Sequence, residues 1–192
     1  YVPPEKSLTH AENFLYMMTG SKPSNDEAQL IDKDFILHAE HSSNASSFTA
    51  RVVAGTGASV YSAITAAIAA LSGPAHGGAA ENVMTMALEI KKPENAKSYV
   101  KDKRKKKQPI MGFGHRVYRT ADPRAKHLKQ GVKDLSEKFN ETQWLQILEA
   151  VEIEMEPYKR LGVAANVDFY AGVIYYLLKI PHEFFVPIFA IG

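Results

Sequence analysis

The chain has 192 residues, of which 45% are hydrophobic and 23% are charged, so it is long and apolar enough to bury a sizeable core. Its 23 lysines and arginines against 21 acidic residues give a formal net charge of +2, which excludes the broad positive field of a nucleic-acid-binding protein. Cysteine is absent, which excludes disulfides, thiolate metal sites and a cysteine nucleophile, and favours a reducing, cytoplasmic location.

Both ends of the chain are typical of a cut from a longer protein. Tyr1 is neither an initiator methionine nor the start of a charged-then-apolar leader, and the chain stops at Gly192, directly after an apolar run. We therefore expect an internal fragment without a targeting peptide.

Apolar residues recur at three- and four-residue steps along most of the chain, which predicts an all-α fold of about nine helices joined by short loops. The first clear helix start is the capping-box pair of Ser24 and Glu27. Behind it, Ala28, Ile31 and Phe35 form one apolar face of the expected helix.

The stretch from Val52 to Ala75 contains no charged residue, so a transmembrane helix has to be considered. The stretch is dominated by Ala, Gly, Ser and Thr and is interrupted at Gly55, Gly57 and Gly73, which argues against a membrane span. We expect instead a small-residue helix that packs closely against another helix, and no association with a membrane.

The segment from Lys101 to Lys107 holds six basic residues and one acid, so the basic character of the chain is local. Its simplest interpretation is a solvated helix end and loop. A nucleic-acid role is the least favoured, because no aromatic residues are interleaved with the charges.

Two later helices are indicated by local signals. Asp122 followed by Pro123 predicts an N-cap and the first residue of a helix that runs to Phe139. The next helix has an apolar face that consists of Trp144, Leu148, Val151 and Met155.

Three helix-joining loops place a titratable side chain beside or near glycine at a helix start: His76 in 72–78, His115 in 111–116 and Asp168 in 165–169. Free N–H groups there favour a neutral histidine and an ionised carboxylate. Two histidines and one aspartate suit enolisation of a thioester followed by carbon–carbon bond formation. Each residue also has a structural interpretation, with Asp168 as an N-cap and the histidines as loop residues with structural hydrogen bonds.

Two other patterns are rejected. The segment 55–60 has the spacing of a dinucleotide-binding loop, but Val60 stands where the last glycine belongs and no strand is expected before it. His38 and His41 are three residues apart on a helix, yet no HExxH pattern or third ligand accompanies them, so no metal site is expected.

The loops that carry His76, His115 and Asp168 are also where the sequence resembles the citrate synthase family. The matching stretches are LSGPAHGGA at 71–79, PIMGFGHRVY at 109–118 with DPR at 122–124, NVD at 166–168, and HAEH with SNAS at 38–41 and 43–46. These four motifs stand in the family's order and at roughly its spacing, and they cover essentially the whole chain.

The resemblance implies an all-α, citrate synthase-like homodimer, or a higher oligomer, that condenses acetyl-CoA with oxaloacetate and water to citrate and CoA. The reaction would pass through a thioester enol or enolate and citryl-CoA. CoA would be a substrate and product carrier, with no tightly bound cofactor and no metal. Two alternatives stay open: a 2-methylcitrate synthase that uses propionyl-CoA, and a non-catalytic CoA-binding or dimerisation module.

The resemblance also implies roles for individual residues. Asp168 would take a methyl proton from the thioester, His76 would stabilise the enol, and His115 would protonate the keto oxygen of oxaloacetate. The residues implied to bind oxaloacetate are His41, Arg124 and, as a weaker candidate, Asn44.

For CoA, the resemblance implies that backbone groups of one loop cradle the adenine. The loop residues are Pro109, Ile110, Met111, Gly112, Phe113 and Gly114. Arg119 would contact the phosphates. For the basic segment 101–107, the functional alternative to a solvated helix end is attraction of the polyanion, because the segment leads directly into this loop.

The resemblance finally implies a division into domains. Residues 1–73 would belong to a large domain, with a dimer-interface helix over Val52–Leu71; residues 74–179 would form a small domain that closes over the substrates; and 180–192 would return to the large domain. The family uses two further C-terminal arginines for oxaloacetate, and the chain ends before either, so little activity is expected from this fragment alone.

Overall fold

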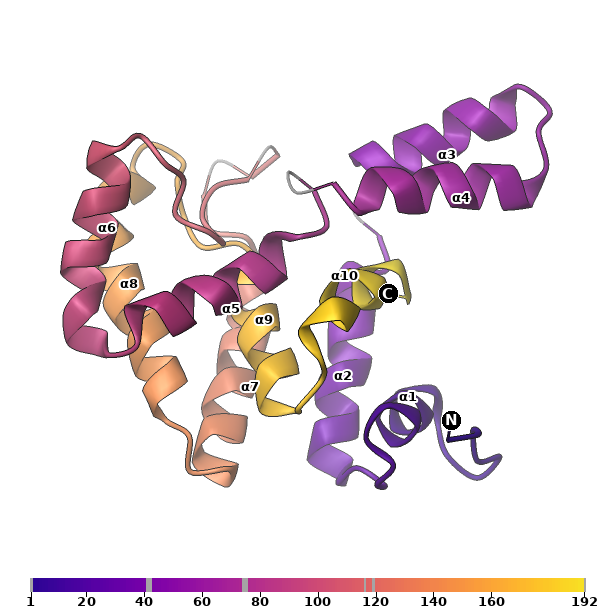
Figure 1. The fold of residues 1–192 in the computed structure, drawn as a ribbon, viewed down its shortest axis with the longest axis horizontal. Helices are drawn as coiled ribbons and strands as arrows, with labels where there is room; N and C mark the ends of the chain where they lie inside the picture. Colours follow the sequence, from indigo (N-terminus) through magenta and orange to yellow (C-terminus); the bar gives the residue numbers. More distant parts are fainter. Residues whose placement is uncertain (1, 41–42, 74–75, 116, 119, 192) are drawn as a thin grey trace.

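In a computed structural model, the chain is built from α-helices (Figure 1). The structure describes residues 2–40, 43–73, 76–115, 117–118 and 120–191. Within these ranges there are ten α-helices, two short 3-10 helices and no strand, which confirms the all-α prediction. The helices are α1 (His10–Thr19), α2 (Asn25–His38), α3 (Ala45–Gly55), α4 (Val60–Leu71), α5 (Ala79–Ile90), α6 (Ala96–Lys105), α7 (Ala125–Lys138), α8 (Gln143–Lys159), α9 (Asp168–Leu177) and α10 (Phe185–Ile191), with 3-10 turns at Pro93–Asn95 and His182–Phe184.

Local signals predicted several helix starts and faces correctly. The Ser24 side chain accepts the Glu27 N–H at 3.4 Å, and the Glu27 side chain accepts the Ser24 N–H at 2.7 Å, so the capping box opens α2. The expected apolar face of α8 is buried in the core at Trp144, Leu148, Val151 and Met155.

The start of α7 differs from the prediction. The helix begins at Ala125 rather than at Pro123, and Asp122 is not its N-cap. The Asp122 carboxylate is instead bound by the Arg124 guanidinium and by the Val167 N–H, which belongs to a distant segment. Asp122 also accepts the Arg124 backbone N–H at 2.9 Å, so it combines a local contact beside the start of α7 with one contact to a distant segment.

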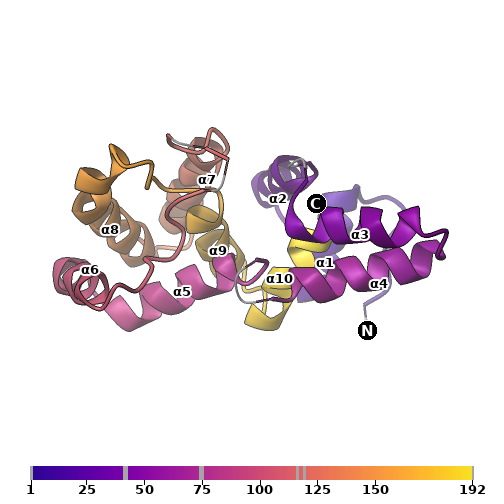
Figure 2. The ribbon, with the colours of Figure 1, turned by 90° about the horizontal axis from the view of Figure 1, so that it is seen from above.

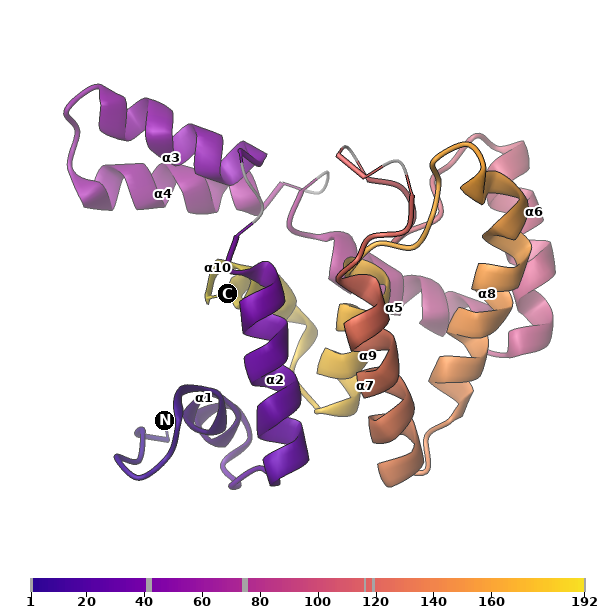
Figure 3. The ribbon, with the colours of Figure 1, turned by 180° about the vertical axis from the view of Figure 1, so that it is seen from behind.

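The stretch Val52–Leu71 is not one helix. It ends α3 at Gly55, turns at Gly57, whose φ is 78°, and continues as α4 from Val60, so α3 and α4 form an antiparallel hairpin (Figures 1 and 3). Gly55 to Val60 thus joins two helices and does not follow a strand, which agrees with the rejection of a dinucleotide-binding loop. No helix in the described ranges has the length and apolar character needed to cross a bilayer.

The helices lie in two groups (Figure 2). Helices α5 to α9 occupy one side, and α1, α2 and α10 lie on the other side with the α3–α4 hairpin. A continuous buried cluster joins the two groups and takes residues from every α-helix except α3 and α4. The hairpin therefore extends from the body without contributing to this core.

Helix α9 is the central helix of the fold. Phe169, Ala171, Val173, Ile174 and Tyr175 are each 0% exposed, so α9 is buried on all sides. Its Gly172 faces the backbone of α5, where a Cβ atom would overlap the carbonyl oxygen of Ala80. The missing side chain lets α5 and α9 approach closely and brings their first turns to one place.

We expect Gly172→Ala to destabilise the fold by about 1 to 3 kcal/mol, because the methyl group must push two packed backbones apart. Gly55→Ala is the matched control, since Gly55 is also helical and its added Cβ would meet nothing within 4 Å. That variant should be neutral or more stable by about 0.5 to 1 kcal/mol. Urea unfolding measures both changes, and equal stability of the two variants would contradict the close contact.

Candidate active site

Four helix ends face the same side of the molecule (Figures 1 and 3). They are the C-terminal end of α2, which carries His38, and the N-terminal ends of α5, α7 and α9, which carry or closely follow the candidates His76, Arg124 and Asp168. Helix N-termini present free N–H groups and partial positive charge. Three of them at one place make this region suited to an anionic ligand.

Asp168 is the first residue of α9, but its side chain does not cap the helix. Val167 occupies the N-cap position, and no side-chain cap hydrogen bond is made from it. The Asp168 N–H instead donates to the Asn166 side-chain oxygen at 3.1 Å. The interpretation of Asp168 as an N-cap is therefore wrong, and its carboxylate is not used to cap the helix.

Burial raises the pKa of Asp168 to about 6. His38 and then Arg124 act in the opposite direction, while the charges of Asp122 and Asp34 raise the pKa further. The helix start alone was expected to keep this carboxylate strongly ionised, and desolvation outweighs that effect. A carboxyl with this pKa suits a general base that works near neutral pH.

Arg124 is held by Asp122 directly before α7. Its Nε donates to Asp122 Oδ1 at 3.0 Å and its Nη2 donates to Oδ2 at 2.8 Å, while Nη1 donates to the Leu37 carbonyl at 3.4 Å. Burial would raise the pKa of Asp122, but the Arg124 contacts hold it below its ordinary value. An oxaloacetate carboxylate would have to share this guanidinium with Asp122, a partner that sequence reasoning missed.

His76 lies against the start of α3. The backbone N–H of Ser46 donates to His76 Nε2 at 3.3 Å, and the Ser46 hydroxyl lies 3.0 Å from the same atom. Because Nε2 accepts, the ring proton is on Nδ1. Burial lowers the pKa of His76, so its neutral form is favoured, as expected.

The Asn44 side chain caps the N-terminus of α3. Its side-chain oxygen accepts the Ser47 N–H at 2.9 Å and the Ser46 hydroxyl at 2.8 Å, so it is the N-cap of α3. Asn44 thus orients Ser46, and Ser46 orients His76. Ser46 lies within a quoted motif, but nothing in the sequence indicated that it would bind a histidine thirty residues away.

His115 is oriented by its own loop. Its Nδ1 accepts the Val117 N–H at 3.0 Å and the Tyr118 N–H at 3.1 Å, so its proton is on Nε2. The Tyr118 ring lies 4.6 Å from the His115 ring and 6.0 Å from the Arg124 guanidinium. This places His115 in the same neighbourhood as Arg124.

The loop Pro109–Gly114 is fixed against the start of α9. The Asn166 N–H donates to the Gly112 carbonyl and its Nδ2 donates to the Gly114 carbonyl, each at 2.9 Å. Gly112 has a φ of 76°, and a Cβ there would lie 2.7 Å from the Phe169 side chain. Ile110 is buried in the core, so a ligand at this loop would meet backbone groups rather than that side chain.

The described contacts place the candidates in two groups. Asp168 interacts electrostatically with Arg124, whose neighbour Tyr118 stacks against His115, while His76 lies with Ser46 and Asn44. His41 and Arg119 lie outside the described residues. His38, which the sequence suggested only as a rejected metal ligand, belongs with Asp168.

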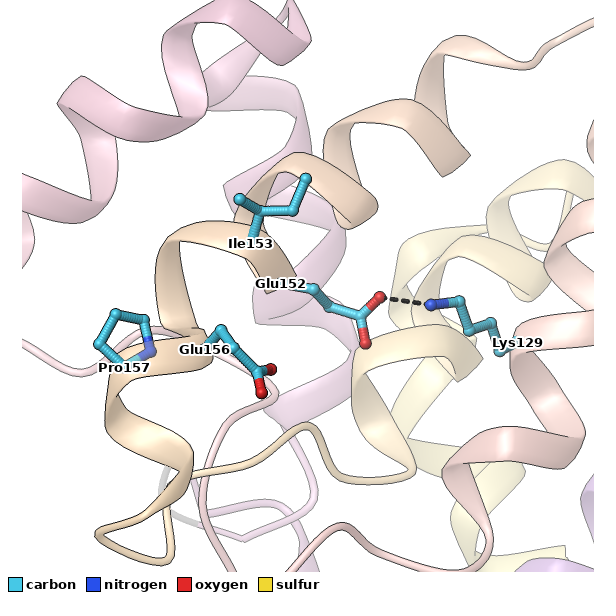
Figure 4. A pocket seen from close by; sticks show the side chains of 5 residues that line it. All are labelled: Lys129, Glu152, Ile153, Glu156 and Pro157. Carbon is cyan, nitrogen blue, oxygen red and sulfur yellow. Dashed lines mark hydrogen bonds and ion pairs between the residues drawn. The ribbon is translucent and has the colours of Figure 1, made fainter.

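A prominent surface hollow lies away from these residues, between α7 and α8 (Figure 4). Glu152 accepts a hydrogen bond from Lys129 at 2.6 Å and another from the Tyr170 hydroxyl at 2.7 Å. With Glu156, the lining has two carboxylates against one ammonium group. That charge disfavours an anionic substrate, so the hollow is not the candidate site.

Comparison with known proteins agrees with the motifs. Residues 1–192 match the family model described as citrate synthase, C-terminal domain. Citrate synthase 2 of Bacillus subtilis (strain 168) is 49% identical over 191 residues, which cover 100% of this chain and 51% of the relative. Citrate/2-methylcitrate synthase of the same organism is 42% identical over 187 residues, which cover 97% of this chain and 50% of the relative. The chain thus spans about half the length of these curated relatives.

Solved structures show the same fold. The crystal structure of citrate synthase from Pyrobaculum aerophilum matches with a TM-score of 0.92 and 46% identity, covering 99% of this chain and 48% of that chain. Citrate synthase from Thermoplasma acidophilum, solved as a ternary complex with carboxymethyl coenzyme A and oxaloacetate, has a TM-score of 0.92 and 35% identity, covering 98% and 51%. The chain therefore belongs to the citrate synthase family.

Proposed function

We propose that the full-length protein condenses acetyl-CoA with oxaloacetate and water to give citrate and CoA. The observation that carries this proposal is the half-buried Asp168 carboxyl at the first turn of α9, which has a pKa of about 6 and interacts electrostatically with His38 and Arg124. The ligands named for the Thermoplasma acidophilum structure support the choice of substrates. A weak base next to cationic groups suits removal of a proton from a thioester methyl group.

Three side chains assist the reaction, two by proton transfer and one by a hydrogen bond. Asp168 takes a methyl proton from the thioester, while the His76 Nδ1–H donates a hydrogen bond to the developing enolate oxygen. The methylene carbon then attacks the keto carbon of oxaloacetate, and the His115 Nε2–H protonates the keto oxygen to form citryl-CoA. Water cleaves the thioester of citryl-CoA and releases citrate and CoA.

Oxaloacetate binds at the converging helix N-termini in this proposal. Arg124 and His41 contact its carboxylates, with Arg124 exchanging part of its contact with Asp122 for the substrate. Asn44 acts nearby mainly through Ser46 and His76. The substrate therefore meets a positive environment that offsets its two charges.

CoA binds along the loop that precedes the candidate site. Backbone groups of 109–114 contact the adenine, and Arg119 contacts the phosphates. The last turn of α6 supports this proposal, because it presents three basic residues at a helix C-terminus that leads into the loop. These charges attract the CoA phosphates during association.

Closure of one part of the protein over the other belongs to the same proposal. Residues 74–179 form the small domain that closes, and 1–73 with 180–192 belong to the large domain. Closure keeps the enolate from water and retains citryl-CoA until it is hydrolysed.

A homodimer through the α3–α4 hairpin is the proposed assembly. The hairpin lies outside the buried core, yet it exposes large apolar side chains. They are Phe48, Val52, Val60, Tyr61, Ile64 and Ile68, which are between 51% and 82% exposed. Several large exposed apolar side chains on one hairpin are typical of an interface.

We expect Asp168→Asn in the full-length protein to lower kcat by at least about a hundredfold, because the amide cannot accept the methyl proton. Oxaloacetate binding should be retained. Since burial raises the pKa of Asp168, its ionised form destabilises the fold above pH 6, so Tm at pH 8 should be unchanged or higher in the variant. Turnover, oxaloacetate affinity and Tm are measured together, and wild-type turnover in a folded variant would refute the mechanism.

We expect kcat/KM of the wild-type protein to fall below about pH 6, where Asp168 takes up a proton and can no longer act as a base. A pH profile with acetyl-CoA and one with propionyl-CoA measure this limb and the acyl preference together. Faster turnover of propionyl-CoA would favour 2-methylcitrate synthesis, and no turnover of either would favour a non-catalytic module.

We expect Ile64→Glu to shift the full-length protein from dimer to monomer, because it places a charge in the proposed apolar interface. Ile153→Glu is the matched control, since Ile153 is 71% exposed on α8, outside the hairpin. Sedimentation velocity distinguishes the two variants. A dimer that withstands Ile64→Glu would place the interface elsewhere.

A further inference from the structure

A buried polar network lies behind Asp168, between α2 and α9. The Asp34 carboxylate is 0% exposed, and its Oδ2 accepts the Tyr175 hydroxyl at 2.6 Å. The other oxygen, Oδ1, lies 3.3 Å from His38 Nδ1, and Nδ1 also donates to the Asp34 backbone carbonyl at 2.9 Å. The His38 side chain is itself 4% exposed and packs edge-on against Phe189, with ring centroids 4.2 Å apart.

The spacing of these residues explains how they meet. Asp34 and His38 are four residues apart on α2, and Asp168 and Tyr175 are seven apart on α9, so each pair shares one face of its helix. The C-terminal end of α2 and the N-terminal end of α9 lie on the same side of the molecule (Figures 1 and 3). The electrostatic interaction between His38 and Asp168 agrees with this arrangement, and the hydrogen bond between Tyr175 and Asp34 joins the two helices further along.

The charges around His38 favour its protonated form. The Asp34 carboxylate lies on the same helix as His38, and α9 contributes Asp168 and Tyr175. The segment before α7 contributes Asp122 and Arg124. Among the described residues of α10, only the Phe189 ring packs against His38. Among the described groups just named, Arg124 is the one permanently charged cation for the carboxylates of Asp34, Asp122 and Asp168. Arg124 is already paired with Asp122. Burial lowers the pKa of His38, but Asp34 and Asp168 raise it more strongly.

Two buried atoms of the network make no hydrogen bond within the described part of the chain. Asp34 Oδ1 and His38 Nε2 are both buried without a hydrogen-bond partner among the described residues. An ionised Asp34 needs a compensating cation at this depth, because one tyrosine hydroxyl does not replace its lost hydration. A doubly protonated His38 supplies that cation, because its Nδ1 lies 3.3 Å from Asp34 Oδ1.

We propose that Asp34, held by Tyr175, is a positioning residue that keeps His38 doubly protonated beside Asp168 and so keeps Asp168 ionised at neutral pH. This inference rests on the proposed function of Asp168 as the base. No proton passes along the network. His38 acts through its charge, and its effect on Asp168 exceeds the opposite effect of Asp34 itself.

Asp34→Asn and Tyr175→Phe in the full-length protein test the proposal. Asp34→Asn removes the charge while keeping the shape, and Tyr175→Phe removes the hydrogen bond that holds the carboxylate. Tyr176→Phe is the matched control, because it removes a hydroxyl from the next residue, whose ring packs against Trp144 and His182 outside the network. Tm of each variant shows whether it folds.

Two readouts are compared. NMR titration of labelled histidine and aspartate side chains should show the pKa of His38 falling by about one unit or more in Asp34→Asn, and that of Asp168 rising. The acid limb of kcat/KM should move to higher pH by about one unit, with turnover at pH 9 within about threefold of wild type. Tyr175→Phe should give smaller shifts in the same directions, and Tyr176→Phe none.

Several outcomes would overturn the proposal. One is an unchanged pKa of His38 in both Asp34→Asn and Tyr175→Phe, and another is a changed pKa of His38 with an unchanged pKa of Asp168. A third is an equal loss of turnover at every pH, which is the signature of a merely structural role. Absence of synthase turnover in the wild-type protein would refute the proposed function instead. The NMR titration would still decide whether Asp34 controls the charge of His38 and Asp168.

Discussion

The buried Asp122 carboxylate joins the starts of α7 and α9. It accepts N–H groups from the Arg124 backbone, the Arg124 guanidinium and the Val167 backbone. At 3% exposure such a charge is stable only with several strong partners, so the pair fixes where both helices begin. The positions of Asp168, of the loop tied by Asn166 and of the guanidinium itself all depend on this contact.

The candidate base occupies an energetically unfavourable position for a carboxylate. Burial opposes the ionised form of Asp168, and His38 with Arg124 only partly offsets it. A more exposed aspartate would be a weaker base, and a more completely paired one would be weaker still. The intermediate environment gives a carboxyl that is mostly ionised at neutral pH yet ready to accept a proton.

The α3–α4 hairpin obeys a different constraint from the rest of the chain. Its helices contribute no residue to the continuous core, and α3 has no buried residue at all among those described. A hairpin of small and apolar residues in that situation gains stability when a further surface covers it. Because Asn44 and Ser46 begin α3 and contact His76, the hairpin is also coupled to the candidate site.

Local features were readable from the sequence alone. The capping box of Ser24 and Glu27, the apolar faces of α2 and α8, and the glycine-flanked loops of His76 and His115 depend on residues a few positions apart, and four motifs identified the family. The tertiary structure decided which groups are buried and which distant partners they find. Tyr175 reaches Asp34 across 141 positions and Val167 reaches Asp122 across 45. Desolvation raises the pKa of Asp168, and the Val167 hydrogen bond ties Asp122 to a distant segment. Both effects arise only when the chain has folded.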